Sequence, residues 1–361
     1  MTTLSLAMIV RDEEKTLALV LADAHAFCDE MVVIDTGSTD ATRDIATAAG
    51  ARVVDFVWVD DFAAARNVSF EACTGDWIIW LDADDRVPRA VQDGLRQAKD
   101  DVLSDALDAI WMPYRYHFDA VTGECTFSLT RERVVRRGAG LRWAGAVHEV
   151  LDVPIGRSLA RDDLFIEHRP LGSKDEVGRG RNLRILELAV NNGDRSSRTL
   201  YYYANELRDT GQDEAALATY REYLDLPAAD WEHYQALMSM SDCAVRCGRE
   251  DEAVEHLHAA LRVDSSRSEA FLALGWRHFQ RQEWARALTW YSAAAAATQP
   301  AVAFVTPADY TWRPLDFMGV CLINLGRHEE GVAASLRSLV GGNPDAERLR
   351  SNLHWAIDEV T

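Results

Sequence analysis

Four residues, Asp82-Ala83-Asp84-Asp85, directly follow the apolar run Trp77-Ile78-Ile79-Trp80-Leu81. Five large apolar residues without alternation predict a strand that is buried on both faces of a sheet. Ionised carboxylates cannot lie within such a strand without partners, so the acidic residues must lie where the strand ends. In open α/β sheets, ligands bind at this carboxyl edge. The run therefore predicts a sheet with an acidic site at its rim.

The acidic residues at this rim favour a metal site. Carboxylates that lie close together repel one another unless a cation lies among them. Aspartate oxygens are hard ligands that favour Mg²⁺ or Mn²⁺, and these ions in turn bind diphosphate oxygens. The alternative interpretation is a solvated acidic turn, because Asp-x-Asp strings are common. Their position directly after a buried strand favours the metal site.

Apolar runs alternate with helical periodicity over the first ninety residues. Strands are expected over 4–10, 31–34, 51–58 and 77–81, separated by helices over 13–27, 45–49 and 62–73. This β-α-β-α-β-α-β order predicts a mostly parallel, Rossmann-like α/β sheet.

Polar residues stand at the ends of three predicted strands: Val10-Arg11, Asp35, and Asp82-Ala83-Asp84. The carboxyl ends of parallel strands lie at one edge of a sheet, so these residues are expected to form one nucleotide pocket with a metal at its side. No Gly-x-Gly-x-x-Gly or Gly-x-x-x-x-Gly-Lys-Ser/Thr string occurs, which disfavours dinucleotide-binding and P-loop folds. A metal, and not a glycine loop, is expected to hold the phosphates.

The charge of the chain limits its partners. At 361 residues the chain is long for one core, so two domains are expected. Its net charge of -20 at pH 7 argues against nucleic-acid and anionic-membrane partners, because both bind basic surfaces. The apolar stretch Leu4–Val10 is too short for an integral membrane segment or a signal peptide, so a cytoplasmic location is expected.

From Gly178 onward, Ala, Leu, Arg and Glu recur at helical spacing, and a longer repeat appears. Its copies are Gly211/Ala216/Tyr220, Gly248/Ala253/Leu257, Gln282/Ala287/Tyr291 and Gly326/Gly331/Ser335. The middle positions are 37, 34 and 44 residues apart, close to the 34 of a tetratricopeptide unit. An all-α helical repeat domain is therefore expected over 176–361, after an α/β domain over 1–175. Such repeats commonly bind peptides or other subunits, which allows a homo-oligomer.

Four motifs in the first ninety residues resemble those of the family-2 glycosyltransferases of the GT-A fold, and specifically of a bacterial branch with C-terminal tetratricopeptide repeats. The motifs lie in the family's order and spacing, at Met8–Glu14, Val33–Asp40, Ala65–Asn67 and Gly75–Asp85. The resemblance implies an inverting enzyme that uses a nucleotide-sugar donor and a divalent metal, Mn²⁺ or Mg²⁺. One departure is Asp85, where the family usually has Glu.

The resemblance also implies roles for individual residues. Val10, Arg11, Glu13 and Asp35 would border the nucleobase and ribose. Because an acid beside a uracil can accept its imide N–H, a UDP-sugar is the expected donor. Asp82 and Ala83 would lie near the ribose or the metal, and Asp84 would ligate the metal. Arg66 could neutralise the diphosphate, or it could be an ordinary arginine on a helix surface.

A later segment, Trp143-Ala144-Gly145-Ala146-Val147-His148-Glu149, resembles a Trp-x-Gly-x-Val-His-Glu segment of the same branch. His148 could be a further metal ligand or a hydrogen-bond donor to the substrate. An inverting transfer needs a general base, and both Glu149 and Asp85 are candidates. His168 is a possible metal ligand or a structural histidine at the domain joint.

The leading hypothesis is thus a metal-dependent inverting glycosyltransferase. It would move a sugar to a hydroxyl or thiol of a peptide, protein or small-molecule acceptor, which the repeat domain could present. Two alternatives remain: a non-catalytic repeat scaffold that binds partner proteins, and a nucleotidylyltransferase. The latter also uses acids on an α/β sheet, but it usually has a glycine-rich loop that is missing here.

Overall fold

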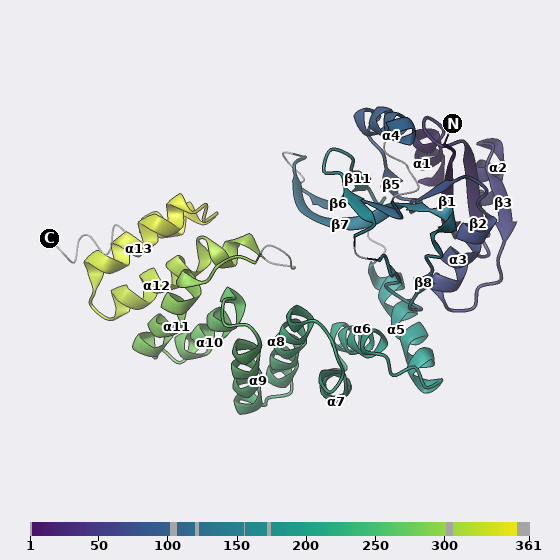
Figure 1. Cartoon of the computed structure of the whole chain (residues 1–361). Coiled ribbons are helices and arrows are strands. Elements are labelled where there is room, and N and C mark those ends of the chain that lie inside the picture. Colours follow the sequence, from purple (N-terminus) through teal and green to yellow (C-terminus); the bar gives the residue numbers. More distant parts are fainter. Residues whose placement is uncertain are drawn as a thin grey trace. The chain divides into compact units, whose positions relative to one another are not determined.

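The computed structural model describes residues 2–101, 107–119, 123–154, 156–171, 175–300 and 306–351. The chain forms two compact units, Met1–Asp194 and Arg195–Thr361 (Figure 1). The predicted boundary at 175/176 lies at the start of helix α5 (Asp175–Asn191), whereas the observed division lies after it. Contacts of α5 explain the difference, because Arg184 pairs with Asp60 and the Arg181 guanidinium lies over the Phe62 ring.

Within its described residues, the first unit contains a nine-stranded, mostly parallel sheet in the order β3-β2-β1-β4-β7-β6-β11-β5, with β10 paired to β6. A small second sheet pairs β8 with β9. The strands are β1 Leu4–Val10, β2 Glu30–Asp35, β3 Arg52–Asp55, β4 Trp77–Trp80, β5 Asp85–Arg86, β6 Ala109–Phe118, β7 Cys125–Arg136, β8 Trp143–Ala144, β9 Val150–Leu151, β10 Ser158–Ala160 and β11 Ile166–His168.

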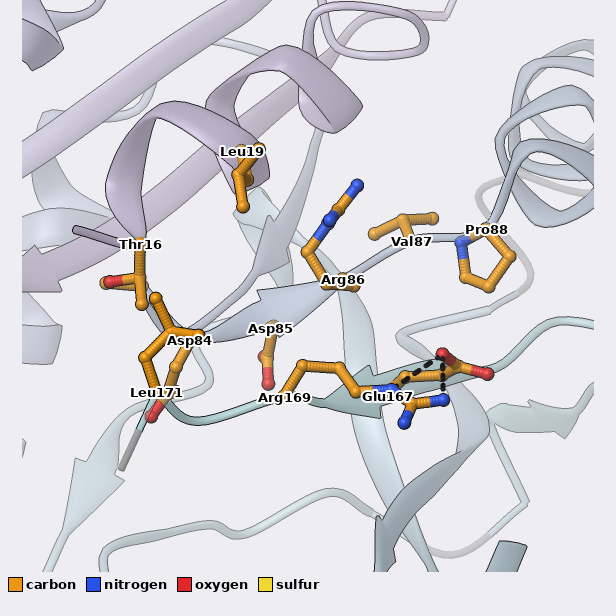
Figure 2. A pocket seen from close by; sticks show the side chains of 11 residues that line it. Thr16, Leu19, Asp84, Asp85, Arg86, Val87, Pro88, Glu167, Arg169 and Leu171 are labelled. Atoms are coloured by element: carbon orange, nitrogen blue, oxygen red, sulfur yellow. Dashed lines mark hydrogen bonds and ion pairs between the residues drawn. The ribbon is translucent and has the colours of Figure 1, made fainter. Parts of the chain in front are cut away.

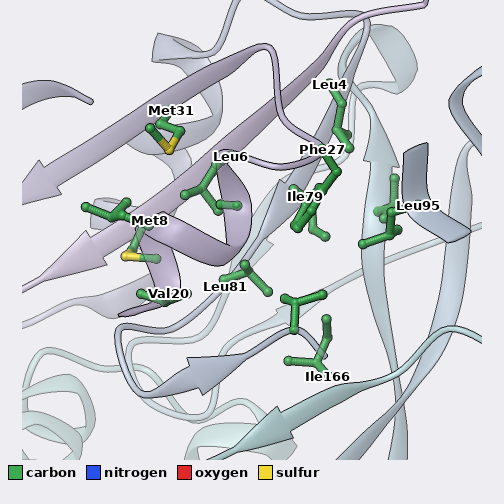
Figure 3. Packing of buried hydrophobic residues seen from close by; sticks show 14 of the residues in the cluster. Leu4, Leu6, Met8, Val20, Phe27, Met31, Ile79, Leu81, Leu95 and Ile166 are labelled. Atoms are coloured by element: carbon green, nitrogen blue, oxygen red, sulfur yellow. The ribbon is translucent and has the colours of Figure 1, made fainter. Parts of the chain in front are cut away.

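Two apolar clusters cover the two faces of this sheet, because side chains alternate along each strand. One cluster joins Leu4, Leu6 and Met8 of β1 to helices α1 (Leu17–Ala24) and α4 (Arg89–Asp101) (Figure 3). The other joins Ala7 of β1 and Trp80 of β4 to helix α3 (Phe62–Ala72) and to strands β8 and β9. Helix α2 (Thr42–Ala48) follows β2. The predicted α/β fold is thereby confirmed.

The strand order reverses direction between β1 and β4, with β2 and β3 lying beyond β1. Both β1–β2 and β1–β4 pairs are parallel, so the carboxyl ends of β1, β2 and β4 meet at one edge. This reversal is a topological switch point, where open α/β sheets bind ligands. The loop after β1 and the acidic turn after β4 both begin there.

Two elements are shorter than the sequence predicts by several residues. Helix α1 begins at Leu17 and not at Glu13, because Glu13 and Thr16 form a turn in which the Thr16 hydroxyl donates to Glu13 Oε2 at 2.8 Å. Strand β3 ends at Asp55 and does not reach residue 58. The chain turns away there, with Asp60 in the left-handed region at φ 59° and accepting a hydrogen bond from Trp58 Nε1.

The second unit consists of antiparallel helix pairs, as the repeat pattern predicts. The helices are α6 Ser197–Asp209, α7 Asp213–Leu224, α8 Asp230–Arg246, α9 Glu250–Val263, α10 Ser268–Gln280, α11 Trp284–Ala296, α12 Arg313–Asn324 and α13 His328–Val340, with a short 3₁₀ helix η2, Pro307–Tyr310. The first residue of each repeat copy lies between two paired helices in the left-handed region, with φ of 76° at Gly211, 74° at Gly248, 58° at Gln282 and 75° at Gly326. The middle residues of the four repeat copies are buried between the helices: Ala216, Ala253, Ala287 and Gly331.

The interior of the repeat depends on close approach of helices at its small residues. A Cβ atom added at Gly275 of α10 would lie 2.6 Å from Cε1 of Tyr291, which is itself fully buried in α11. The Tyr291 ring stacks on Phe317 of α12 at a centroid distance of 4.9 Å, so it cannot move aside freely.

Gly275→Ala should therefore destabilise the repeat by about 1–3 kcal/mol, the usual cost of overpacking a filled core. Thermal unfolding followed by circular dichroism checks it. Gly180→Ala in α5 is the control, because nothing lies within 4 Å of the added Cβ. Alanine there should be neutral or stabilising, since glycine costs a helix interior roughly 0.5–1 kcal/mol. A Gly275→Ala protein as stable as the wild type would contradict the packing.

A second prediction concerns acid stability. Glu30 at the start of β2 accepts hydrogen bonds from Ser5 Oγ at 2.6 Å and from Thr74 N at 2.8 Å, and it pairs with Arg52. Burial alone would raise the pKa of Glu30, but these hydrogen bonds lower it to about 2 from an ordinary 4.5. The carboxylate therefore stabilises the fold above pH 4.5, and this stabilisation is lost as the pH falls towards 2.

Glu30→Gln should lower the free energy of unfolding at pH 7, and the difference from wild type should shrink as the pH falls from 4.5 towards 2. Urea unfolding at a series of pH values measures this. Glu71→Gln, which removes an exposed partner of Arg142, is the surface control. A wild-type–mutant difference that stays constant with pH would contradict the assignment.

Candidate functional site

The loop after β1 and the loop after β2 hold each other. Asp12, in the left-handed region at φ 54°, accepts a hydrogen bond from Thr39 N at 2.7 Å, and its own N–H donates to Ser38 Oγ. Glu13 N donates to Thr42 Oγ1 at 2.7 Å. Val10, which ends β1, is buried, while the Arg11 side chain is exposed. Residues of two predicted strand ends are thus brought to one edge of the sheet.

Asp35 is buried at the end of β2 and organises the loop that follows it. Its Oδ1 accepts hydrogen bonds from the N–H groups of Gly37 and Ser38, and its Oδ2 accepts one from Arg43 at 2.8 Å. Burial raises the pKa of this carboxyl, but the hydrogen bonds from Ser38, Arg43 and Gly37 outweigh burial and hold the pKa below its usual range. The role of Asp35 beside a nucleobase stays a prediction.

The acidic stretch after β4 forms a tight turn. Asp82 N donates to Asp85 Oδ2 at 3.0 Å, and Asp85 N donates to the backbone oxygen of Asp82 at 3.0 Å. Asp85 is fully buried, Ala83 is buried, and the Asp82 and Asp84 side chains are 33% and 15% exposed. The turn therefore points its first and third residues towards solvent and its last residue inward.

Asp85 is held from three sides. Tyr114 of β6 donates its hydroxyl to Oδ1 at 2.8 Å, while Asp82 N and Arg133 of β7 donate to Oδ2. Arg133 is fully buried, and its guanidinium lies 3.8 Å from the Trp80 ring centroid and 4.1 Å from that of Tyr114. Burial raises the pKa of Asp85, although Arg133 opposes the shift.

His168 comes to the acidic turn through strand pairing, because β11 pairs antiparallel with β5 and sets His168 opposite Asp85. Its Nδ1 lies 3.6 Å from Asp84 Oδ1, 4.0 Å from Asp85 Oδ1 and 3.0 Å from the Tyr114 hydroxyl. Its ring stacks on Tyr116 at 4.5 Å. Burial lowers the pKa of His168 despite the opposing charge of Asp84, which favours the neutral ring that a metal ligand requires.

Among the described residues, Asp84, Asp85 and His168 form a cluster of three potential metal ligands, with one ligand atom of each within 4.8 Å of the others. Two carboxylates and one imidazole form a donor set that suits Mn²⁺ and related divalent cations. The sequence predicted Asp84 and His168 as ligands, and the fold brings both together. His148, a further predicted ligand, is exposed and in the left-handed region at φ 54°, and it is not a member of this cluster.

Arg66 lies between the acidic turn and the segment that contains Glu149. Its Nη2 donates to Asp82 Oδ1 at 2.8 Å and its Nε donates to Glu149 Oε1 at 2.5 Å. The side chain is 9% exposed, so it is not an ordinary arginine on a helix surface. Burial alone would raise the pKa of Asp82, but the charges of Arg66 and Arg133 lower it to about 2.

The acidic residues outnumber the buried arginines that balance them. Asp82, Asp84, Asp85 and Glu149 contribute four carboxyl groups, and Arg66 and Arg133 contribute two guanidinium groups. When all six are ionised, the excess is two negative charges. One divalent cation has the charge that would neutralise this excess.

A cavity of about 440 Å³ opens beside this cluster (Figure 2). Its volume lies within the range of small-molecule sites, roughly 300–1,000 Å³. The wall combines Asp84, Asp85, Glu167 and Arg169 with apolar side chains such as Leu19 and Leu171. Asp84 and Asp85, two of the three potential ligands, therefore border a space that can admit a substrate.

Sequence reasoning missed Tyr114 and Arg133, which hold Asp85. None of the motifs includes Tyr114, which lies in β6. Arg133 precedes Val134-Val135 in β7, and a charged residue next to a buried apolar pair is a signal of an internal ion pair. That signal names no partner, because Asp85 lies 48 residues earlier in the chain.

The family model described as Glycosyl transferase family 2 matches residues 5–119. A TPR repeat-containing protein of Synechococcus elongatus is 38% identical over 152 residues, which cover 42% of this chain and 36% of that protein. The glycosyltransferase SunS of Bacillus subtilis is 25% identical over 223 residues, or 60% of this chain and 51% of SunS. This chain therefore spans only about a third to a half of the length of these curated relatives.

Among solved structures, the C-terminal part of a TPR repeat-containing protein from Cytophaga hutchinsonii is 10% identical, with a TM-score of 0.42 over 51% of this chain and 67% of that chain. This TM-score lies below 0.5, so the fold assignment rests on the strand order, the helix pairs and the family match.

In the described part of the chain, no helix combines the length and apolarity needed to cross a membrane. The chain carries an N-terminal glycosyl transferase family 2 domain of GT-A type, followed by a tetratricopeptide-like helical repeat region.

Proposed function

We propose that this protein is a metal-dependent, inverting glycosyltransferase that moves a sugar from a nucleotide-sugar to a hydroxyl or thiol acceptor. The observation that carries the proposal is the cluster of Asp84, Asp85 and His168 beside a cavity, in a domain that matches family 2. The cluster lies at the switch point of the sheet, where a nucleotide pocket is expected. A UDP-sugar is the proposed donor.

Asp84 and His168 are the proposed ligands of Mn²⁺ or Mg²⁺, supported by the 3.6 Å between Asp84 Oδ1 and His168 Nδ1. Such an ion, when bound, stabilises negative charge on a departing diphosphate. Asp85 is the least exposed member of the cluster and is fixed by Tyr114 and Arg133. We assign it to holding the turn and completing the negative site, and not to accepting a proton from the acceptor.

Glu149 is the proposed general base. Its Oε1 is bound to Arg66, while no described residue provides a hydrogen bond to its Oε2. The acceptor oxygen or sulfur forms a bond to the anomeric carbon and gives its proton to Oε2. The bond from that carbon to the diphosphate oxygen breaks, and its electron pair leaves with the nucleoside diphosphate. Glu149 then releases the proton to solvent.

The proposal also covers the acceptor and the role of the repeat unit. The repeat unit is made of paired helices, an architecture whose concave surface commonly binds peptides and proteins. We propose that it recruits a peptide or protein acceptor for the glycosyltransferase domain. Removing the repeat would then lower transfer to that acceptor but leave hydrolysis of the donor by water unchanged.

Asp84→Ala should abolish metal-dependent turnover, because it removes a carboxylate from the proposed ligand set. Hydrolysis of UDP-glucose and UDP-N-acetylglucosamine with Mn²⁺, together with calorimetric titration of Mn²⁺, measures the effect. We expect a fall of at least about 10²-fold in turnover, since the ion acts on the charge of the leaving group. Asp163→Ala, which removes an exposed partner of Arg161, is the matched control. Full activity and unaltered Mn²⁺ binding in Asp84→Ala would refute the metal site.

Glu149→Gln and Asp85→Asn separate the two candidate bases. Glu149→Gln should lower kcat by about 10²- to 10⁴-fold, the contribution of a positioned general base. Asp85→Asn leaves the Tyr114 and Arg133 contacts partly intact, so its main effect should fall on stability and Mn²⁺ affinity. The kcat of each variant at saturating Mn²⁺ and donor decides between them. Normal turnover in Glu149→Gln would exclude Glu149 as the base.

A further inference from the structure

Three residues of helix α3 hold the segment of residues 143–149, which contains Glu149. The Asn67 side chain donates to Trp143 O at 3.0 Å and accepts from Trp143 N at 2.9 Å, which fixes the backbone where the segment begins. Phe62 N, at the start of α3, donates to Ala146 O at 2.9 Å. Arg66 binds the carboxylate at the end of the segment. Helix α3 therefore contacts this segment at its start, its middle and its end.

The Arg66 guanidinium is itself restrained on its faces and edges. It lies 4.9 Å from the Trp80 ring centroid and 5.0 Å from that of Trp143. Its Nε and Nη2 donate to two carboxylates that are 67 residues apart in the chain, Asp82 and Glu149. A planar guanidinium that donates to two acids fixes their relative positions, which a lysine could not do.

We propose that Arg66 is a positioning residue for Glu149 and not a ligand of the donor diphosphate. Arg66 fixes Oε1, so that Oε2 is presented to the acceptor. Two of the five N–H donors of the guanidinium already serve the two carboxylates, and the guanidinium lies against Trp80 and Trp143. This inference rests on the proposed function, because it assigns how the proposed base is held.

Arg66→Ala tests the inference, with Arg131→Ala as the matched control. Arg131 also lies against Trp80, at 5.1 Å, but its ion pair is with Glu132 and not with Glu149. Donor hydrolysis with Mn²⁺ and UDP-glucose or UDP-N-acetylglucosamine gives kcat and KM. We expect Arg66→Ala to lower kcat by about 10²-fold, the lower end of the contribution of a general base, with little change in donor KM. Arg131→Ala should leave both close to the wild-type values, because it removes a partner of Glu132 and leaves the Glu149 carboxylate paired with Arg66.

Two further results would show that Arg66 acts through Glu149. In a Glu149→Gln background, Arg66→Ala should cause no further loss of kcat, because the effects of substitutions at residues that act as a unit do not add. Added guanidinium should restore part of the activity of Arg66→Ala and none of that of Glu149→Gln. An Arg66→Ala protein with raised donor KM and normal kcat would overturn the proposal in favour of donor binding. Multiplicative losses in the double variant would overturn it as well.

Hydrogen exchange of residues 143–151 provides a readout that needs no turnover. Arg66→Ala should speed exchange in this segment, and Arg131→Ala should leave it unchanged. A wild-type protein that hydrolyses no UDP-sugar would refute the proposed function alone. Unchanged exchange in Arg66→Ala would then refute the positioning role separately.

Discussion

The balance between clustered carboxylates and two buried arginines is the interaction on which the rest of the first unit depends. Trp80, the last residue of β4, lies against the guanidinium groups of both Arg66 and Arg133. Without these cations, the acids after β4 could not be removed from water at a tolerable cost. The buried strand, the stacked arginines and the acidic turn are therefore parts of a single arrangement.

This arrangement explains why the sheet is no longer purely parallel beyond β4. Strands β1 to β4 are parallel and need only apolar side chains between helices. Strand β7 then runs antiparallel beside β4, and this pairing carries Arg133 into the interior behind Asp85. Strand β11 finally brings His168 to the same turn. The later strands thus supply partners for residues that the first four strands place at the rim.

Local patterns in the sequence predicted much of this fold. The strands that begin at Trp77 and at Leu4 follow from burial patterns over a few residues. Gly211 follows from the backbone preference of a single residue, because glycine adopts the left-handed region readily. The meeting of Asp84 with His168 depended on motif resemblance, because residue pairing across a sheet cannot be read from periodicity. The sequence around Arg133 indicated an internal ion pair but did not identify Asp85 as its partner. The early end of β3 could not be predicted, because it depends on the left-handed conformation of Asp60.

The antiparallel pairing of β5 with β11 has a consequence for how such proteins diversify. Because side chains alternate along a strand, a shift of one residue in this ladder would turn His168 towards the opposite face and dismantle the ligand set. The chain between the two strands is also restrained, because it contains Tyr114 and Arg133, which hold Asp85. Insertions and deletions that preserve the ligands should therefore fall in its turns between strands. Grafting of foreign loops should be confined to those turns.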